Sequence, residues 1–449
     1  MKLRKSWLWG GVALVLGLAL GWNFAGPVKV FGQGSGKSLQ PSLSPAPISD
    51  GKLKVFAQAL ALIEQNYVEP KTTKQLVYGA LQGAVGTLDP HSSFMTPDEF
   101  RELQIETKGK FSGIGIEITL KDGVLTVVSP IEGTPAYQAG MKAGDQIVKI
   151  NGTPTKNITL MEAVKKIRGP KGSKVTITIN REGFKHPKDV VITRQIIPIR
   201  SVKARILSDG IGYIRITNFQ DSTDHDLEAY IKKMKHRLVP FKGLILDLRN
   251  DPGGLLEQAV RVANEFLKSG LIVYTEGRTR NQNMRFYASS NDDAKVTNVP
   301  MVVLINQGSA SASEIVAGAL KDQRRALIVG TKSFGKGSVQ TIIPLDDGSA
   351  LRLTTALYFT PSGITINDKG IQPEVKVAEK KLPKNESLKQ LRDELLTEHM
   401  RRQGLTDKPW NQPVTAKELD RDPQLKKAVE LLSHWPPPKN LAKYLTPQK

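Results

Sequence analysis

Residues 243–267 read GLILDLRNDPGGLLEQAVRVANEFL, and this stretch indicates the fold class of the surrounding chain. Its first part, 243–248, is apolar apart from Asp247 and typical of a buried strand, and 255–267 repeats apolar residues at helical spacing. On either side the same reasoning predicts helices at 222–237 and 311–321 and strands at 211–216, 271–275, 301–305, 326–330 and 351–359. Alternating strands and helices indicate an α/β core with a layered β-sheet covered by helices.

The chain has 449 residues, more than one domain usually holds, so two to three folded units are expected. Cysteine is absent, which excludes disulfides, thiolate catalysis and cysteine-ligated metals. We find no His-Glu-x-x-His pattern in the sequence and expect neither a metal ion nor another cofactor. The formal net charge of +21 is spread along the chain, which favours a solvated basic surface over a nucleic-acid partner or general attraction to an anionic membrane.

The N-terminus has the pattern of a membrane-targeting segment. Lys2, Arg4 and Lys5 precede an apolar run at 7–25, so residues 1–26 are expected to be a signal sequence or a membrane anchor. The run is about as long as a spanning helix requires, and no clean Ala-x-Ala cleavage site follows, which favours the anchor slightly. The basic flank should stay cytoplasmic, so we expect the rest of the chain to be exported.

Changes of composition suggest the domain boundaries. Residues 27–50 are rich in Gly, Ser and Pro and are expected to form a flexible linker. A small helical unit is predicted at 51–106, short strands separated by turns at 107–196, the α/β core at 197–380, and a charged helical tail at 381–449. Apolar spacing predicts two helices in that tail, one around 388–395 and one around 425–432.

A loop and a helix start interrupt the helical pattern of the 51–106 unit. Leu88-Asp89-Pro90-His91-Ser92-Ser93 breaks the pattern, and we interpret His91 as a structural histidine in a loop rather than a catalytic one. A new helix is expected after it, with Thr96 as the cap and Pro97 at its first position.

Ser311, in Gly308-Ser309-Ala310-Ser311-Ala312-Ser313-Glu314, has two interpretations. Ser311 followed three residues later by Glu314 fits the capping box of a helix. Ser311 is also a candidate nucleophile, and the two are compatible, because an oxyanion formed at a helix N-terminus faces free backbone N–H groups. A serine hydroxyl needs a base, and a neutral lysine can serve.

Lys336, in Gly335-Lys336-Gly337-Ser338-Val339-Gln340, is the candidate base, with Phe334, Val339 and Ile342 as candidates for the apolar surroundings that would keep it neutral. Residues 330–337 nearly match a Walker A phosphate loop, which makes an NTPase an alternative. Against it, Gly337 stands where Ser or Thr should bind magnesium, and the next segment is predicted to be a strand rather than a helix.

Two other features bear on the chemistry. No Gly-x-Ser-x-Gly elbow is present in the sequence, and none of the histidines lies beside the serine or lysine motif, so histidine-dependent hydrolases fit poorly. Leu248-Arg249-Asn250-Asp251-Pro252-Gly253-Gly254 follows a buried strand and opens a helix. It is either a tight turn that needs glycine or a loop whose N–H groups face a substrate oxygen, and its place after the carboxyl end of a strand favours the second.

Taken together and in this order, these motifs resemble the carboxy-terminal processing peptidases, or tail-specific proteases, which are serine proteases with an inserted PDZ domain. The resemblance covers roughly residues 50–380 and rests on segments at 88–92, 111–116, 133–136, 143–145, 248–254, 309–315 and 335–340. It implies a crotonase- or Clp-like α/β protease core, a PDZ domain inserted at 107–196 and a small helical N-terminal domain.

The resemblance also implies roles for individual residues. Ser311 would be the nucleophile, Lys336 the general base and Gln340 the residue that orients the lysine. Oxyanion contacts would come from the backbone of Ala312 and of the Gly253-Gly254 turn. In the PDZ domain, the loop that receives a free C-terminal carboxylate would be formed by Gly113, Ile114, Gly115 and Ile116.

Arg168 ends an element near that groove. It is either a reader of groove occupancy that regulates the protease or an exposed helix-terminal arginine.

The expected function is therefore a serine endopeptidase that captures the C-terminal tails of proteins and cleaves through an acyl-enzyme, trimming or degrading envelope or lumenal proteins. The expected locations are the periplasm or cell envelope and the thylakoid lumen. The main alternative is a non-catalytic, membrane-tethered PDZ scaffold, which would not need to retain Ser311, Lys336 and Gln340. The sequence leaves the natural substrate open, and it allows, without requiring, a homo-oligomer paired through the helical ends of the chain.

Overall fold

The computed structural model describes residues 50–121, 123–131, 133–207, 210–289, 295–379 and 416–445. The predicted signal sequence or anchor at 1–26, the linker up to residue 49 and the tail helix expected around 388–395 lie outside the described residues. Among the helices that are described, none is both long enough and apolar enough to span a bilayer. The chain divides into two compact units at Val77 and Tyr78.

The helices expected at 51–106 are present. They are α1 (Asp50–Asn66), α2 (Thr73–Gly86) and α3 (Pro97–Lys108). The predicted start of α3 is confirmed, because Thr96 and Glu99 form a capping box and Pro97 is the first helical residue. In α1, the described chain leaves an apolar surface exposed, formed by Leu53, Val55, Phe56, Leu62 and Ile63.

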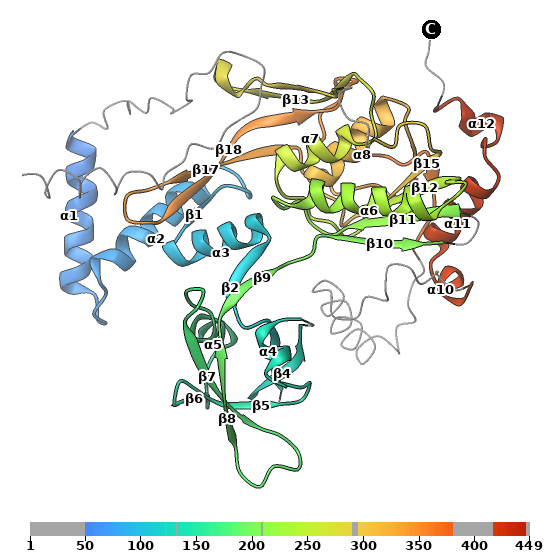
Figure 1. Cartoon of the computed structure of the whole chain (residues 1–449). Coiled ribbons are helices and arrows are strands. Elements are labelled where there is room, and N and C mark those ends of the chain that lie inside the picture. The colour runs from blue at the N-terminus through green and yellow to red at the C-terminus, as the bar shows by residue number, and fades with distance from the viewer. Residues whose placement is uncertain are drawn as a thin grey trace, which may run out of the picture. The chain divides into compact units, whose positions relative to one another are not determined.

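The part predicted to be a PDZ domain, 107–196 (the PDZ part), forms a small sheet of its own. Its strands are β3 (Ile116–Lys121), β4 (Val124–Pro130), β5 (Gln146–Ile150), β7 (Lys174–Asn180) and β8 (Lys188–Thr193), paired in that order, with β6 (Thr153–Pro154) against β5. Helices α4 (Pro135–Gln138) and α5 (Leu160–Ile167) accompany the sheet. Strands β2 (Lys110–Gly113) and β9 (Gln195–Pro198) pair antiparallel, so the chain enters and leaves this part side by side, as Figure 1 shows. This arrangement is that of an inserted domain.

The predicted α/β core contains a six-stranded sheet. Its order is β10 (Val202–Ile206), β11 (Ile211–Ile216), β12 (Gly243–Asp247), β15 (Met301–Ile305), β16 (Leu327–Gly330) and β19 (Val375–Lys376). Strand β10 is antiparallel to β11, and the other neighbours are parallel. Parallel strands joined through helices confirm the α/β core expected from the alternating pattern.

Helices cover both faces of this sheet (Figure 1). Apolar residues of α6 (Thr223–Arg237), α7 (Leu256–Asn264) and α8 (Ala312–Asp322) form one buried cluster with the strand residues Leu244, Leu246, Val303 and Ile328. The alternate strand residues, Ile245, Val302, Leu304 and Val329, pack instead with Leu425, Leu431 and Leu432 of α11 (Pro423–Ser433). The predicted helix around 425–432 is thus confirmed, and it packs on the second face of the sheet.

A second sheet of the same unit holds the residues that follow Lys336. Its central strand, β18 (Ala350–Phe359), pairs with β17 (Ser338–Pro344), with β1 (Ser93–Met95) and with β13 (Leu271–Gly277). Strand β14 (Arg285–Tyr287) extends it beyond β13. The strand predicted after Gly337 is therefore present as β17, in the place where a phosphate loop would open a helix. The Walker A interpretation is wrong for this structural reason.

Candidate active site

Ser311 lies in a tight turn between β15 and α8. Its backbone angles are φ 53° and ψ −111°, and a positive φ is rare for a residue that carries a side chain. Such a conformation costs roughly 1–3 kcal/mol and is found mainly where the surrounding structure enforces it at functional sites. The turn therefore presents Ser311 at the start of a helix at an energetic cost, as expected for a nucleophile.

Ser309 and Ser313 have structural roles. Both are fully buried, whereas Ser311 is 9% exposed. Ser309 Oγ donates to the carbonyl of Leu248 at 2.7 Å, and Ser313 Oγ donates to the carbonyl of Asp251 at 3.0 Å. These two serines tie the Ser311 turn to the loop that follows β12.

A buried carboxylate, which the sequence reasoning considered only as part of a capping box, joins the two candidate catalytic segments. Glu314 Oε2 accepts hydrogen bonds from the backbone N–H of Ser311 at 2.8 Å and of Lys336 at 2.9 Å. Glu314 Oε1 accepts from the Ser333 hydroxyl and the Gly335 N–H, both at 2.6 Å. Burial raises the pKa of the Glu314 carboxyl, and these hydrogen bonds oppose that rise. One side chain thus holds the Ser311 turn against the Lys336 loop.

Lys336 is half-buried in the loop before β17. Burial lowers the pKa of its ammonium group, and the positive charge of Arg352 lowers it further, while Glu314 acts in the opposite direction. The net shift is toward the neutral amine that a general base requires. Val339, one of the residues expected to surround Lys336 with apolar groups, packs on the main core. Phe334 is 61% exposed and shields the Lys336 amine little from water, so the expectation is wrong for Phe334.

Gln340 is held from the neighbouring strand. Its Nε2 donates to Thr354 Oγ1 at 2.8 Å and to Ser338 Oγ at 3.2 Å. Its Oε1 is buried and has no hydrogen-bond partner among the described residues. The side chain therefore carries an unused buried acceptor, which is what a residue that orients a lysine must offer.

The Gly253-Gly254 turn lies directly against Ser311. A methyl group added to Gly253 would approach the Ala312 nitrogen and Ser311 Cβ to 2.9 Å, and φ is 100° at Gly253 and 146° at Gly254. Only glycine suits both the angles and the space. The Gly253 N–H is already donated to Asp251 Oδ1 at 2.8 Å. Of the two glycine N–H groups, that of Gly254 is thus the one left for an oxyanion.

A buried ion-pair network that the sequence did not reveal supports this turn. Arg249 donates to Asp247 and also to Asp422, with its Nη2 at 2.6 Å and 2.8 Å from their oxygens. Burial acts to raise the pKa of Asp247, but Arg249, Arg215 and Tyr213 together outweigh burial and lower that pKa to about 2. Asp422 caps α11, so the helix that covers the sheet is bonded to the start of the 248–254 loop. No sequence motif signals the pairing of Arg249 with Asp422, because the two are separated by 173 residues.

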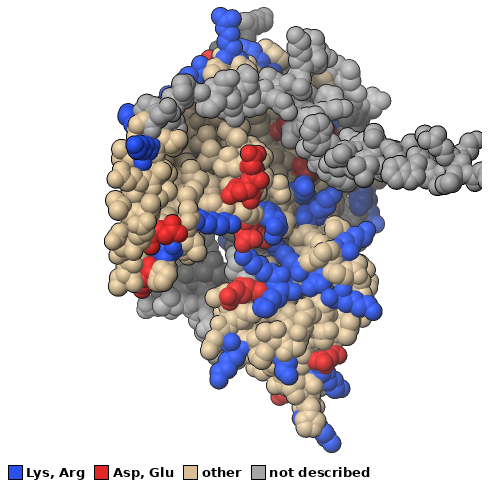
Figure 2. All heavy atoms as spheres, turned by 90° about the vertical axis from the view of Figure 1, so that its left-hand side faces the viewer, with Lys and Arg blue, Asp and Glu red and all other residues tan. Residues whose placement is uncertain are grey.

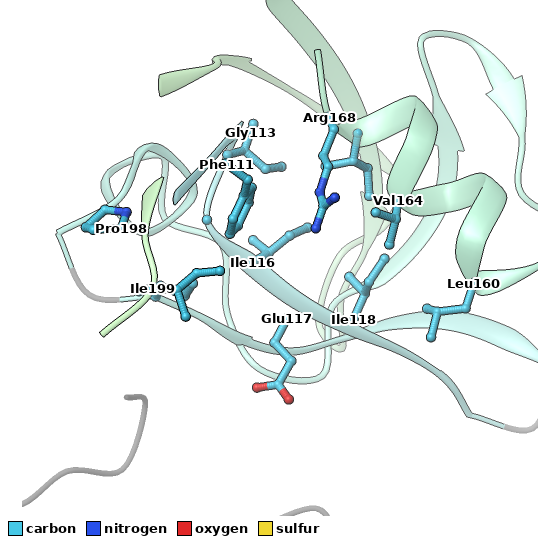
Figure 3. A pocket seen from close by; sticks show the side chains of 14 residues that line it. Phe111, Gly113, Ile116, Glu117, Ile118, Leu160, Val164, Arg168, Pro198 and Ile199 are labelled. Atoms are coloured by element: carbon cyan, nitrogen blue, oxygen red, sulfur yellow. The ribbon is translucent and has the colours of Figure 1, made fainter. Parts of the chain in front are cut away.

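The PDZ part contains a groove with a volume of about 270 Å³. Figure 3 shows the side chains of Ile116, Ile118, Leu160 and Val164 along it, and the predicted loop Gly113, Ile114, Gly115 and Ile116 forms part of its lining. Gly115 has φ 76°, and an added methyl group would meet Thr134 at 2.4 Å, so glycine is required there. The lining is mainly apolar, which suits an apolar side chain of a bound peptide.

Arg168 stands at the edge of this groove (Figure 3). Its Nη1 donates to both carboxylate oxygens of Glu102 in α3, at 2.7 and 2.6 Å, and its guanidinium lies 4.8 Å from the ring centre of Phe111. It is thus not a simple exposed arginine, because it links the groove to a helix outside the PDZ part.

Three further observations concern surface charge, potential metal ligands and His91. On the face seen in Figure 2, many Lys and Arg side chains lie close together, with acidic side chains among them and uncharged surface around them. No cluster of three or more potential metal ligands occurs among the described residues. The backbone N–H of His91 donates to Asp89, so this residue takes part in the architecture of its loop.

Three segments match known protein families. Residues 210–377 match peptidase family S41, residues 126–181 match the PDZ domain, and residues 29–99 match the N-terminal domain of the activating protease CtpB. The carboxy-terminal-processing protease of Bartonella bacilliformis is 49% identical over 336 residues, which are 74% of this chain and 76% of the relative. The chain belongs to the carboxy-terminal processing proteases of peptidase family S41.

Two further proteins are similar to this chain. The carboxy-terminal processing protease CtpA of Bacillus subtilis is 38% identical over 74% of this chain and 70% of its own. The solved structure of a photosystem II D1 C-terminal processing protease is 30% identical, covers 75% of this chain and 95% of its own, and superposes with a TM-score of 0.42. The family matches and the Bartonella relative show that the chain is a serine-type peptidase with a PDZ domain. They confirm the fold and the family expected from the motifs.

The geometry predicts that Glu314→Gln loses both stability and activity. Glutamine offers only one carbonyl oxygen to the four donors, so some buried N–H or O–H groups lose their acceptor. A hydrogen bond to a charged group contributes about 1.5–3 kcal/mol, and we expect a loss of that size or more in the free energy of unfolding. Urea unfolding measures it, with Glu276→Gln as an exposed control. Equal stability and activity of the Glu314 and Glu276 variants would contradict the bridging role.

Proposed function

We propose that this protein cleaves peptide bonds through a Ser311–Lys336 dyad. The observation that carries the proposal is the Glu314 carboxylate, which accepts from the backbone of both residues and so fixes their loops together. The lowered pKa of Lys336, the positive φ of Ser311 and the glycine turn packed against Ser311 support the same assignment.

The proposed reaction is acyl transfer. Neutral Lys336 Nζ takes the proton of Ser311 Oγ while Oγ attacks the scissile carbonyl carbon. The N–H groups of Ala312 and Gly254 stabilise the oxyanion, and Ala312, as the first residue of α8, lies at the positive end of the helix dipole. Lys336 then gives the proton to the leaving amine, and water, deprotonated by the same lysine, hydrolyses the ester. Gln340 Oε1 is proposed to orient the lysine by accepting a hydrogen bond from Nζ.

The three neighbouring serines allow a matched test of the nucleophile. Ser311→Ala should abolish cleavage of an unfolded protein substrate, because the hydroxyls of Ser309 and Ser313 are buried and bonded to the backbone. Ser309→Ala and Ser313→Ala should lose mainly stability, since each removes a buried hydrogen bond, typically ~1 kcal/mol. Cleavage rates and urea unfolding of the three variants separate the two effects. Turnover by Ser311→Ala at the parental rate would refute the assignment.

We also propose that the PDZ groove captures the substrate's C-terminal tail. Strand addition beside β3 would supply backbone hydrogen bonds, and the Gly113–Ile116 loop would receive the free carboxylate. The apolar lining favours a final residue with an apolar side chain. Arg168, bonded to Glu102 of α3, is proposed to report an occupied groove to the rest of the enzyme.

The PDZ proposal predicts a dependence on the tail itself. A substrate ending in an apolar residue should be cleaved faster with a free carboxylate than with an amide, because the amide brings no charge to the loop. Arg168→Ala should reduce this difference, whereas Arg101→Ala, an exposed arginine of α3, should not. Steady-state kinetics on the paired peptides measure both. Equal rates for acid and amide in the parent enzyme would contradict tail capture.

The N-terminal pattern and the surface of α1 bear on location and assembly. We propose export to a cell envelope or an organellar lumen, with residues 1–26 as signal or anchor, on the basis of the basic and apolar pattern at the N-terminus. The exposed apolar residues of α1 support a homo-oligomer in which this helix is covered by another subunit.

A further inference from the structure

Phe334 lies in a loop whose backbone is held on both sides of it. Its own N–H donates to the carbonyl of Ser309 at 3.0 Å. The Ser333 hydroxyl and the Gly335 N–H both donate to the buried Glu314 carboxylate at 2.6 Å. The conformation of this loop is therefore set by hydrogen bonds that do not involve the Phe334 side chain.

Burial alternates along the same loop. Every second residue is buried, namely Ser333, Gly335 and Gly337. Between them, Phe334 is 61% exposed and Lys336 is half-buried. Phe334 belongs to none of the three buried apolar clusters formed by the described residues. Its ring thus lies on the solvent side of the loop, close to the candidate base.

The position of Phe334 brings its ring within reach of a bound substrate. Phe334 is two residues from Lys336, and its N–H is bonded to Ser309, which is two residues from Ser311. Two residues span at most about 7 Å. A peptide placed for attack by Ser311 therefore has the residues next to its scissile bond within reach of the ring.

An exposed phenylalanine on a fixed loop is suited to binding an apolar group. The ring offers a large apolar area, and little conformational freedom is lost on binding because the backbone is already held. Single exposed apolar residues are common on protein surfaces and need no explanation by themselves. Phe334 differs from them because its loop joins the Lys336 segment to the Ser311 turn.

We propose that Phe334 forms an apolar subsite of the candidate active site, which takes an apolar side chain of the substrate next to the scissile bond. The inference rests on the proposed Ser311–Lys336 reaction and adds a substrate class to it. Apolar side chains are mostly buried in folded proteins, so such a subsite favours unfolded or extended segments.

The subsite affects substrate binding more than the chemical step. The contact involves none of the reacting atoms, so it is made equally in the bound substrate and in the transition state. Such uniform binding lowers KM and leaves kcat nearly unchanged. Loss of the ring should therefore raise KM for substrates with an apolar residue at this position. Damage to the loop would instead lower kcat, because Lys336 would be misplaced.

The test compares peptides that share one C-terminal tail and differ only at the two residues flanking the scissile bond. Each of these positions carries Leu or Asn, which are similar in size but differ in polarity, and mass spectrometry of the products verifies the cleaved bond. The parent enzyme should prefer Leu at one position by about 10-fold in kcat/KM. Phe334→Ala should remove most of this preference through KM, whereas Phe334→Tyr should keep it because the ring remains.

Tyr287→Ala is the matched control. Tyr287, in β14, is an aromatic residue with 59% exposure and takes no part in the proposed reaction. Its loss should leave kcat, KM and the preference for Leu unchanged. Urea unfolding verifies that each variant is folded.

The inference is overturned if the parent enzyme shows no preference for Leu at either position, or if folded Phe334→Ala keeps the preference. It is also overturned if Phe334→Ala lowers kcat equally for Leu and Asn peptides, because the residue would then act on the loop and not on the substrate. These outcomes differ from failure of the proposed function, in which the parent enzyme would show no cleavage that depends on Ser311.

Discussion

The arrangement of the active site depends on one buried carboxylate. Glu314 is the third residue of α8 and accepts hydrogen bonds from Ser311 at the start of that helix and from three residues of the 333–336 loop. The Ser311 turn follows a strand of the six-stranded sheet and the Lys336 loop leads into the second sheet, so this carboxylate joins the two sheets at the candidate active site. Removing either set of donors would leave a buried charge short of partners, which is costly. The strained backbone at Ser311 is tolerated because several surrounding hydrogen bonds hold the turn in this conformation.

Further contacts on the side of each sheet stabilise this junction. On the side of the six-stranded sheet, Arg249 bonds the 248–254 loop to Asp422 at the start of α11, so this helix supports the turn that faces Ser311. On the side of the second sheet, β1 adds the 88–93 loop to β18 and thereby to Gln340. The family match at 210–377 includes neither Asp422 nor the 88–93 loop, although both are bonded to it.

The sequence allowed most of the fold to be predicted, because secondary structure depends on local patterns, whereas the roles of the candidate site residues were inferred from the family resemblance. The alternation of strands and helices, the capping box at Thr96 and the strand after Gly337 all follow from periodicity and turn chemistry. The pairings of Arg249 with Asp422 and of Thr354 with Ser92 could not be predicted in that way, because such contacts depend on which elements become neighbours. The expectation for Phe334 was wrong for a related reason, since the side a loop residue faces is set by the packing around it.

The most direct test of the account is the site and pH dependence of covalent modification by a serine-directed fluorophosphonate. Peptide mass mapping should find the adduct on Ser311 alone. The rate of labelling should rise with pH through an apparent pKa below that of an ordinary lysine, and Lys336→Met should remove this dependence together with most of the reactivity. An adduct on Ser309 or Ser313, or labelling of Ser311 at the same rate and pH dependence in Lys336→Met, would contradict the Ser311–Lys336 dyad.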